Sequence, residues 1–187
     1  MLYSVLCVFH LIVFYTHKNK KIMHADTARW LQVYKLHYKQ SLGFIFLLSH
    51  YPEFRNLFYY RAGVISNLLK IFCPRMNTLF ITTDSIGEGL FIQHGFATVI
   101  AARSIGKNCW INQQVTIGFS NESDCPVLKD NVTVNAGAKV IGGITIGNNS
   151  QIGANAVVVK NVPDNCVVVG IPAYIIKRNG VKVREEL

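Results

Sequence analysis

The chain has 187 residues, half of them hydrophobic, which suits one or two small domains with a substantial core. Its five cysteines are scattered without a close pair or a metal-binding spacing, which argues against a Cys-based metal site and predicts reduced cytosolic thiols. The net charge of +9 comes almost entirely from residues 1–78, where ten Lys and Arg accompany two acidic residues; residues 79–187 hold nine and eight. Such a basic half predicts contact with anionic lipid or a phosphate-bearing substrate, with a merely solvated surface as the alternative, and no nucleic-acid-binding motif accompanies it.

Residues 1–22 begin with a strongly apolar run, MLYSVLCVFHLIVFYT, which a basic HKNKK follows. The run is shorter than the ~20 residues of a membrane span, and it lacks the basic start and the cleavage site of a signal peptide. Two interpretations remain: a short membrane anchor with its basic flank in the cytoplasm, or an extension ahead of a natural start at Met23. We favour the second, because the residues after Met23 already make a complete helical domain.

Residues 23–76 are predicted to form this small helical domain. Asp26 or Thr27 would cap a first helix, Pro52 would open another, and Pro74 would end the helical pattern. Apolar and aromatic residues recur at helical spacing between these points, which predicts helices with one packed apolar face.

Residues 77–178 carry a different pattern, in which an apolar residue returns every six positions. One interval is seven residues, from Ile92 to Val99, and one is eleven, from Ile117 to Leu128. The complete series is Phe80, Ile86, Ile92, Val99, Ile105, Ile111, Ile117, Leu128, Val134, Val140, Ile146, Ile152 and Val158. Helices need apolar spacings of three and four, so we expect short strands joined by tight turns, with the apolar residues stacked inward. A period of six is typical of a hexapeptide β-helix, whereas the strands of a β-sandwich are not spaced so evenly.

This repeat region resembles the hexapeptide-repeat acyltransferases, of the serine acetyltransferase and polysaccharide O-acetyltransferase kind. The resemblance implies a mainly β fold, a left-handed parallel β-helix with three repeats per coil, preceded by the small helical domain. It also implies acetyl-CoA as co-substrate, no metal, and a homotrimer whose sites are shared between neighbouring subunits. The segment 167–173 matches the ending seen across this family, and residues 179–187 are then a tail.

His94 is the one histidine of the repeat region and the candidate catalytic base. It directly precedes Gly95, lies just before the seven-residue interval, and falls where enzymes of the serine acetyltransferase type carry their catalytic His. Inward positions are expected at Ile92 and Phe96, so the imidazole should point outward. Imidazole can take the proton of an attacking alcohol near neutral pH, so direct transfer from a thioester needs no covalent intermediate. The orienting Asp of the family is Leu79 here, which leaves a backbone carbonyl as partner of the ring, and a plain surface His is the alternative.

The acceptor is expected to be a sugar hydroxyl. Serine acetyltransferases hold serine with an acidic residue before the catalytic His and an Arg-His pair before a Pro, where this chain has Gln93 and Asp124-Cys125. Asp cannot replace an Arg that binds a carboxylate, which favours O-acetylation of a capsule, exopolysaccharide or lipopolysaccharide precursor. Gln93, Phe119 and Asp124 are the candidate acceptor-binding residues, and loop 119–127 the candidate acceptor flap. Serine O-acetyltransferase is the first alternative and a non-catalytic β-helix scaffold the second.

Acetyl-CoA is expected in a groove between neighbouring subunits, as the resemblance implies. Gly118, Ala136 and Ala154 would leave room for its pantetheine arm, and Lys160 and Lys177 would meet its phosphates. A backbone N–H, for example that of Gly118, would stabilise the oxyanion. Tight turns also require small residues, and a solvated surface is the alternative for the lysines. With a single His in the repeat region, a zinc site of the carbonic anhydrase type is close to excluded. We expect a cytoplasmic protein, with peripheral contact at the inner membrane face through its basic half as a further option.

Overall fold

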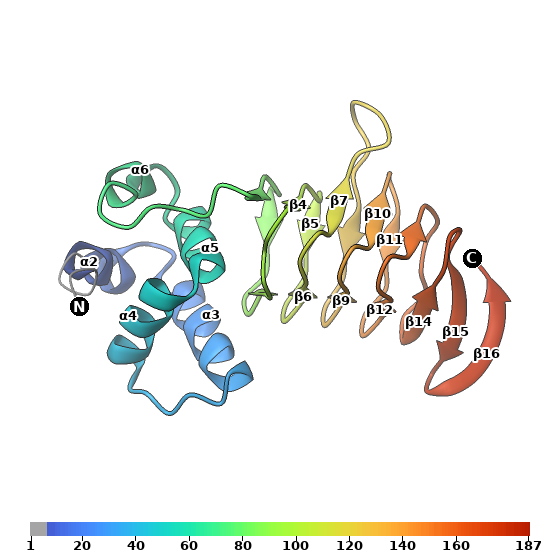
Figure 1. The fold of residues 1–187 in the computed structure, drawn as a ribbon, viewed down its shortest axis with the longest axis horizontal. Coiled ribbons are helices and arrows are strands. Elements are labelled where there is room, and N and C mark those ends of the chain that lie inside the picture. Colours follow the sequence, from blue (N-terminus) through green and yellow to red (C-terminus); the bar gives the residue numbers. More distant parts are fainter. Residues whose placement is uncertain (1–6) are drawn as a thin grey trace. The chain divides into compact units, whose positions relative to one another are not determined.

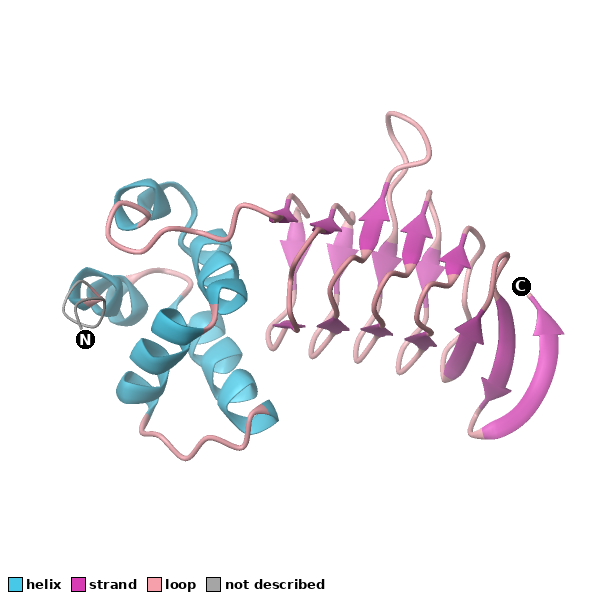
Figure 2. Ribbon diagram, in the orientation of Figure 1, coloured by secondary structure: helices cyan, strands magenta, loops and turns pink. Residues whose placement is uncertain are grey.

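The computed structural model of the protein describes residues 7–187. It divides into two compact units, a helical unit that ends at Asn77 and a β-helix unit that begins at Thr78 (Figure 1 and Figure 2). The boundary lies one residue from the one predicted between residues 76 and 77. Each unit has its own apolar core, as the change in periodicity at this point of the sequence requires.

The helical unit contains short helices separated by turns. Its elements are α2 (Val8–Thr16), α3 (Lys20–Val33), α4 (Gln40–His50), α5 (Pro52–Ala62), the 3-10 turn η1 (Gly63–Ile65) and α6 (Ser66–Leu69). Pro52 stands at the start of α5, where its missing N–H costs no hydrogen bond, and Gly63 ends that helix with φ of +61°. Asp26 and Thr27 lie inside α3, so the prediction that either caps a helix is wrong.

The core of the helical unit is aromatic. Phe14 of α2 stacks on Phe44 of α4 with ring centroids 4.1 Å apart, and Trp30 of α3 meets Phe54 of α5 edge-on at 5.2 Å. All four side chains are buried. Because Phe14 belongs to this core, the described residues before position 23 are part of the helical unit, which differs from the predicted extension over residues 1–22.

The β-helix unit is a stack of coils with three faces, and each face is a sheet in which the stacked strands of successive coils run parallel. Sheet A contains β1 (Leu79–Ile81), β4 (Thr98–Ile100), β7 (Thr116–Gly118), β10 (Lys139–Ile141) and β13 (Val157–Val158). Sheet B contains β2 (Ser85–Ile86), β5 (Ser104–Ile105), β8 (Val127–Leu128) and β11 (Thr145–Ile146). Sheet C contains β3 (Phe91–Ile92), β6 (Trp110–Ile111), β9 (Thr133–Val134), β12 (Gln151–Ile152), β14 (Cys166–Val169), β15 (Tyr174–Arg178) and β16 (Val181–Glu186). The chain visits the sheets in the order A, B, C and thus makes one coil per three strands.

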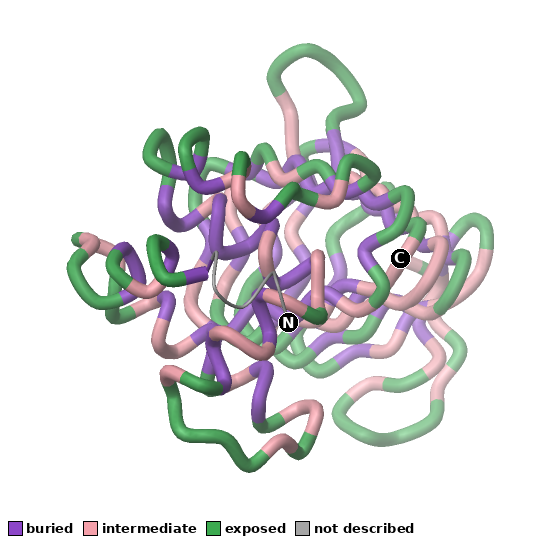
Figure 3. The backbone as a smooth tube through the Cα atoms, turned by 60° about the vertical axis from the view of Figure 1, so that its left-hand side comes forward, coloured by how far each residue is buried: buried purple, intermediate pink, exposed green. Residues whose placement is uncertain are grey.

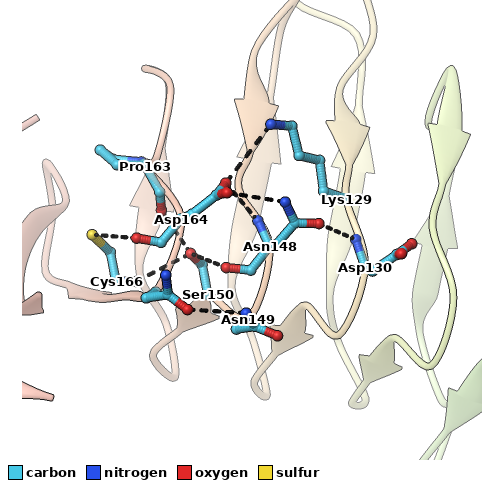
Figure 4. A network of polar contacts seen from close by, with 9 residues as sticks. Lys129, Asp130, Asn148, Asn149, Ser150, Pro163, Asp164 and Cys166 are labelled. Atoms are coloured by element: carbon cyan, nitrogen blue, oxygen red, sulfur yellow. Dashed lines mark hydrogen bonds and ion pairs between the residues drawn. The ribbon is translucent and has the colours of Figure 1, made fainter. Parts of the chain in front are cut away.

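Asparagines hold the turns between sheets B and C. Asn131, Asn149 and Asn165 adopt the left-handed conformation, with φ of +58°, +57° and +56°, which Asn tolerates better than most residues. Their side chains form a ladder, because the Asn131 amide donates to Asn149 Oδ1 at 3.0 Å and the Asn149 amide to Asn165 Oδ1 at 2.9 Å. Around this ladder, Ser150 Oγ donates to the Pro163 carbonyl and accepts from Cys166 N–H (Figure 4). The turn residues therefore tie successive coils together.

The interior of the coils is a stack of aliphatic side chains, and buried and exposed residues alternate along each coil (Figure 3). From Ile105 to Val158 the six-residue series predicts these inward residues correctly, since every member there is buried. The first strands of sheet A depart from the series. Leu79 and Ile100 are buried, whereas Phe80 is 53 % exposed and Val99 half-buried, so the predicted inward positions are one residue off in β1 and β4.

The last strands reverse direction. β15 pairs antiparallel with β14, and β16 pairs antiparallel with β15. The predicted tail, residues 179–187, is therefore largely the outermost strand of sheet C. Arg178 and Glu185 bind each other across this hairpin at 2.5 Å.

Candidate functional site

His94 lies in a turn that is one residue longer than its neighbours. Residues 93–97 join β3 to β4, whereas residues 112–115, 135–138 and 153–156 make the equivalent turns of the later coils. Those later turns have one residue in the left-handed region each: Gln114, Gly137 and Asn155. The first turn has two, His94 with φ of +56° and Ala97 with φ of +50°. A left-handed conformation is uncommon for residues other than Gly, with Asn, Asp and His the most frequent exceptions, so the longer turn is unusual in having two such residues.

The imidazole of His94 is exposed and free to meet another molecule. Its backbone carbonyl accepts a hydrogen bond from Phe96 N–H, but among the described residues the ring itself has no hydrogen-bond partner. The predicted backbone partner of the ring is thus not found, and Leu79 is buried in the coil. Phe96 is 53 % exposed, because it occupies the outward position of the turn, so the prediction that it points inward is wrong.

Two of the candidate cofactor residues follow His94 along the same edge of the β-helix, which we call the histidine edge: the turns from sheet C to sheet A. Ala136 and Ala154 stand in the third and fourth of these turns, and Asn155 N–H donates to the Ala136 carbonyl at 2.9 Å. Gln93 is half-buried beside His94. Three coil spacings separate His94 from Ala154, or ~15 Å at the usual distance between parallel strands. The histidine edge therefore has the imidazole in its first turn, Gln113 and Gln114 in its second, and small alanines in its third and fourth.

The other candidates lie on a different edge, which we call the loop edge: the turns from sheet A to sheet B. Gly118 ends β7 at this edge, Phe119 follows it and is 51 % exposed, and Lys160 stands two coils further on. A Cβ built on Gly118 would have Thr116 Cγ2 at 3.9 Å as its nearest neighbour, so space lies open beside this glycine. At Gly87, Gly106, Gly147 and Gly153, a Cβ would instead lie 2.7, 2.3, 2.4 and 2.6 Å from its nearest neighbour.

The loop edge carries an insertion, residues 119–126, where the neighbouring coils have the three-residue turns 101–103 and 142–144. This loop stands away from the coils beside β7 (Figure 1). Asp124 organises it: the carboxylate accepts hydrogen bonds from Ser120 N–H at 2.8 Å, Ser120 Oγ at 2.5 Å and Asn121 N–H at 3.1 Å. These bonds, that of the Ser120 hydroxyl foremost, lower the pKa of Asp124. The carboxylate predicted to bind the acceptor is thus engaged by its own loop.

Arg103 is a cation of the loop edge that the sequence pattern did not single out. Its backbone N–H donates to the Pro126 carbonyl at 2.8 Å, which places it at the base of the inserted loop, and its side chain is exposed. An arginine in the previous coil has no sequence signal that connects it to the loop. Only the pairing of β5 with β8 brings the two together.

A cavity of about 620 Å³ lies at the C-terminal end of the β-helix unit. It is lined by Val157, Val159, Lys160, Ile171, Pro172, Ala173, Tyr174, Arg184, Glu185, Glu186 and Leu187. Lys160 Nζ donates to the Leu187 carbonyl at 2.5 Å, and the Arg184 guanidinium lies 5.6 Å from the centre of the Tyr174 ring. Lys160 and Arg184 therefore supply two cations to one cavity, whereas Lys177, exposed on β15, does not line it.

The candidate residues fall on two edges that bound the same sheet. Gln93, His94, Ala136 and Ala154 lie along the histidine edge, and Gly118, Phe119, Asp124 and Lys160 lie along the loop edge, with sheet A between them. A single chain does not bring the two rows together. The arrangement can form one site where the histidine edge of one copy meets the loop edge of another.

Comparison with known proteins gives one consistent answer. The family model for "Bacterial transferase hexapeptide (six repeats)" matches residues 125–160. A serine acetyltransferase of Synechococcus elongatus is 42% identical over 132 residues, which are 68% of this chain and 54% of that protein. The chain thus spans about half the length of this relative.

Solved structures agree with this family. The crystal structure of Neisseria gonorrhoeae serine acetyltransferase has a TM-score of 0.71 and 26% sequence identity, over 89% of this chain and 68% of that one. Brucella abortus serine acetyltransferase in complex with coenzyme A shares the fold, with a TM-score of 0.67 and 23% identity over 91% of this chain and 72% of that one. The predicted fold class, a left-handed parallel β-helix preceded by a small helical unit, is confirmed.

The predicted sugar acceptor is wrong, because these relatives are serine acetyltransferases and none of them is an enzyme of polysaccharide assembly. The prediction depended on Gln93 and Asp124 as substitutes for charged serine-binding residues. Ser120 and Asn121 donate hydrogen bonds to the Asp124 carboxylate. The negative charge at this position therefore does not indicate what the acceptor is. The six-residue repeat, the three-sided coil and these relatives together show that the chain contains bacterial transferase hexapeptide repeats and is similar to serine acetyltransferases.

Proposed function

We propose that the protein is a serine O-acetyltransferase that uses acetyl-CoA as donor. The proposal depends on one observation above all: an exposed imidazole with a left-handed backbone, in a turn one residue longer than the equivalent turns of the later coils. The names of the relatives support the donor and the acceptor.

In this proposal His94 is the general base. Its neutral imidazole takes the proton of the serine hydroxyl while the hydroxyl oxygen attacks the thioester carbonyl carbon. The tetrahedral intermediate then loses the thiolate of coenzyme A, and the proton on the imidazole neutralises that thiolate, which leaves O-acetylserine and free coenzyme A. A backbone N–H at the loop edge, with Gly118 as the candidate, stabilises the oxyanion.

The donor would lie where the histidine edge of one copy meets the loop edge of another. The open space at Gly118 and the small side chains of Ala136 and Ala154 fit a thin pantetheine arm. Lys160 and Arg184, which line one cavity together with Glu185 and Glu186, would hold the phosphates of coenzyme A. Gly118, Ala136 and Ala154 fit the co-substrate by size.

The acceptor needs a cation for its carboxylate, and we assign this role to Arg103. Its guanidinium is exposed at the base of the inserted loop, and an arginine can bind a carboxylate with two parallel hydrogen bonds. Gln93, next to the base, can hydrogen-bond the serine amine or hydroxyl. Arg103 and Gln93 lie on different edges, so this site needs two copies of the chain, in keeping with the trimer that is typical of the fold.

Thiol release tests the proposal. Purified protein is given acetyl-CoA with L-serine, with D-serine, with 3-hydroxypropionate, which lacks the amine, or with sugars, and free coenzyme A is followed together with O-acetylserine by mass spectrometry. We expect turnover with L-serine and at least a ~10² loss of kcat in His94→Ala. His37→Ala is the matched control, since His37 is an exposed histidine of the helical unit. Full activity in His94→Ala, or turnover with sugars and not with serine, would overturn the assignment.

Arg103 is tested by separating KM from kcat. Removing the cation should raise KM for serine by about tenfold or more and leave KM for acetyl-CoA unchanged, because a charge-assisted hydrogen bond contributes about 1.5–3 kcal/mol. Arg103→Ala and Arg103→Lys should differ, since lysine keeps the charge without the two-pronged geometry. An unchanged KM for serine in Arg103→Ala would remove Arg103 from the site and leave the role of His94 intact.

A further inference from the structure

The surface charge of the helical unit has one sign. Residues 1–77 hold ten Lys and Arg and only two acidic residues, Asp26 and Glu53. Both acids are buried, and Asp26 is engaged by the equally buried Arg61 at 2.9 Å. The basic residues other than Arg61 are exposed or half-buried. The solvent-exposed charged groups of the helical unit are therefore all positive.

The same unit has an apolar outer surface on α2. Val13 and Phe14 face the core, while Val8, Phe9 and Ile12 on the other side are each more than half exposed. The helix is therefore apolar on both faces, which is usual for a helix covered on both sides and unusual for one whose outer face meets water. Tyr15, 44 % exposed, continues this outer face by one more turn.

A second apolar strip lies on the segment that contains α6. Leu68 is 66 % exposed and Ile71 75 % exposed, and their spacing of three puts them on one side of a helical segment. The ring of Phe72 stacks on that of Phe9, with centroids 5.1 Å apart, which joins this strip to the outer face of α2. We call the joined surface the apolar platform: Val8, Phe9, Ile12, Tyr15, Leu68 and Ile71.

Basic residues flank the apolar platform. Lys18, Lys20 and Lys21 follow directly on the C-terminal end of α2, and all three are exposed. Lys70 lies between the two exposed residues of the second strip. Apolar side chains beside a row of lysines are the combination that binds at the interface of an anionic bilayer, where the apolar groups enter the headgroup boundary and the lysines meet lipid phosphates.

We propose that the helical unit docks on the surface of an anionic membrane through the apolar platform and its flanking lysines. Within residues 7–187 no helix has the length and hydropathy needed to cross a bilayer, so the contact is interfacial. An acidic partner protein or a nucleic acid would match the charge, but neither accounts as well for so many exposed aliphatic side chains next to it. The proposal does not depend on the acetyltransferase assignment.

Co-flotation with vesicles tests the docking. The full-length protein is mixed with vesicles of phosphatidylcholine alone or with 30 mol% phosphatidylglycerol, and the bound fraction is measured at 50 and 300 mM NaCl. We expect binding only to the anionic vesicles and a loss of most of it at the higher salt. Lys18→Gln, Lys20→Gln and Lys21→Gln together should weaken binding by about 100-fold, at about fivefold for each lysine.

The apolar part is tested with Ile12→Asp and Leu68→Asp. Both side chains are exposed, so the fold should survive, which circular dichroism and the thiol-release activity check in the same samples. Val181→Asp is the matched control, since Val181 is 65 % exposed on β16 in the other unit. Each platform variant should lose at least tenfold in vesicle binding, and the control should match the wild type.

Three results would overturn the proposal. Wild-type protein that fails to float with anionic vesicles excludes the membrane. Platform variants that bind as the wild type does exclude this surface. A wild-type assembly that is larger than the Ile12→Asp assembly in analytical ultracentrifugation without lipid would show that a second copy of the chain covers the platform instead.

Discussion

A methyl group at position 118 is the sharpest probe of the proposed donor site beside sheet A. The structure predicts that Gly118→Ala leaves the fold intact, because the new Cβ would have its nearest neighbour, Thr116 Cγ2, at 3.9 Å and the backbone needs no positive φ. Replacing a glycine whose conformation suits alanine adds between zero and about 1 kcal/mol of stability through the unfolded chain. The melting temperature should therefore stay within a few degrees of the wild type, or rise slightly.

The same methyl group should damage donor binding. If pantetheine lies against Gly118, the added carbon takes space that the arm needs, at a cost of about 1–3 kcal/mol, or about five- to 150-fold in KM for acetyl-CoA. The KM for serine should change little. The assay is thiol release at saturating serine with acetyl-CoA varied, together with calorimetric titration of coenzyme A into both proteins.

Gly87→Ala supplies the contrast. A Cβ at Gly87 would lie 2.7 Å from the Gly106 carbonyl carbon and 2.8 Å from Lys107 N, both backbone atoms of the next coil. This variant should lose about 1–3 kcal/mol of stability or more, with whatever effect on KM follows from partial unfolding. A Gly118→Ala protein that melts as the wild type does and binds coenzyme A equally well would refute the placement of the donor beside sheet A.

Three further predictions follow from the described contacts. Asp26→Asn should lower the free energy of unfolding by about 3–5 kcal/mol, because it leaves Arg61 buried without its charge partner, whereas Glu88→Gln, at an exposed ion pair, should cost less than about 1 kcal/mol; urea denaturation compares the two. The pKa of Asp124 is lowered in the folded loop, so the ionised carboxylate stabilises the loop fully above the ordinary carboxyl pKa of about 4. This stabilisation is lost as the pH falls through the lower pKa of the folded state. Asp124→Asn should therefore speed proteolysis of residues 119–126 at neutral pH. Cys125 is half-buried while the other four cysteines are buried, so native protein should show one fast-reacting thiol with a disulfide reagent, and Cys125→Ser should remove it.

The inward residues of the β-helix could be predicted from the sequence, except near the turn at residues 93–97. From Ile105 onward a single apolar residue marks each inward position, and the period alone finds it. In β1 three apolar residues stand in a row, Leu-Phe-Ile, and the period cannot tell which of them points inward. The longer turn at residues 93–97 then shifts the count, so that Ile100 rather than Val99 continues the interior stack.

The candidate site divides in the same way. His94 could be found because it is the only histidine of the repeat region and lies at an irregular interval. The position of His94 relative to Gly118 and Lys160 could not be found. Every third turn of the β-helix lies on the same edge, and the longer turns at residues 93–97 and 119–126 disturb that count. Arg103 was missed because its link to the inserted loop is a hydrogen bond between coils and leaves no trace in the spacing.

The reversal of direction at β15 and β16 has a consequence for polymerisation. Every coil of a parallel β-helix offers the next one an unsatisfied strand of matching polarity, so a stack without a terminator is a template for end-to-end filaments. Here β15 runs antiparallel to β14 and β16 antiparallel to β15, so a hairpin takes the place of a further coil, and Lys182, Arg184 and Glu186 line the exposed side of the outermost strand. A second coil arriving at this end would meet a line of charge, so residues 174–187 disfavour end-to-end growth of the stack.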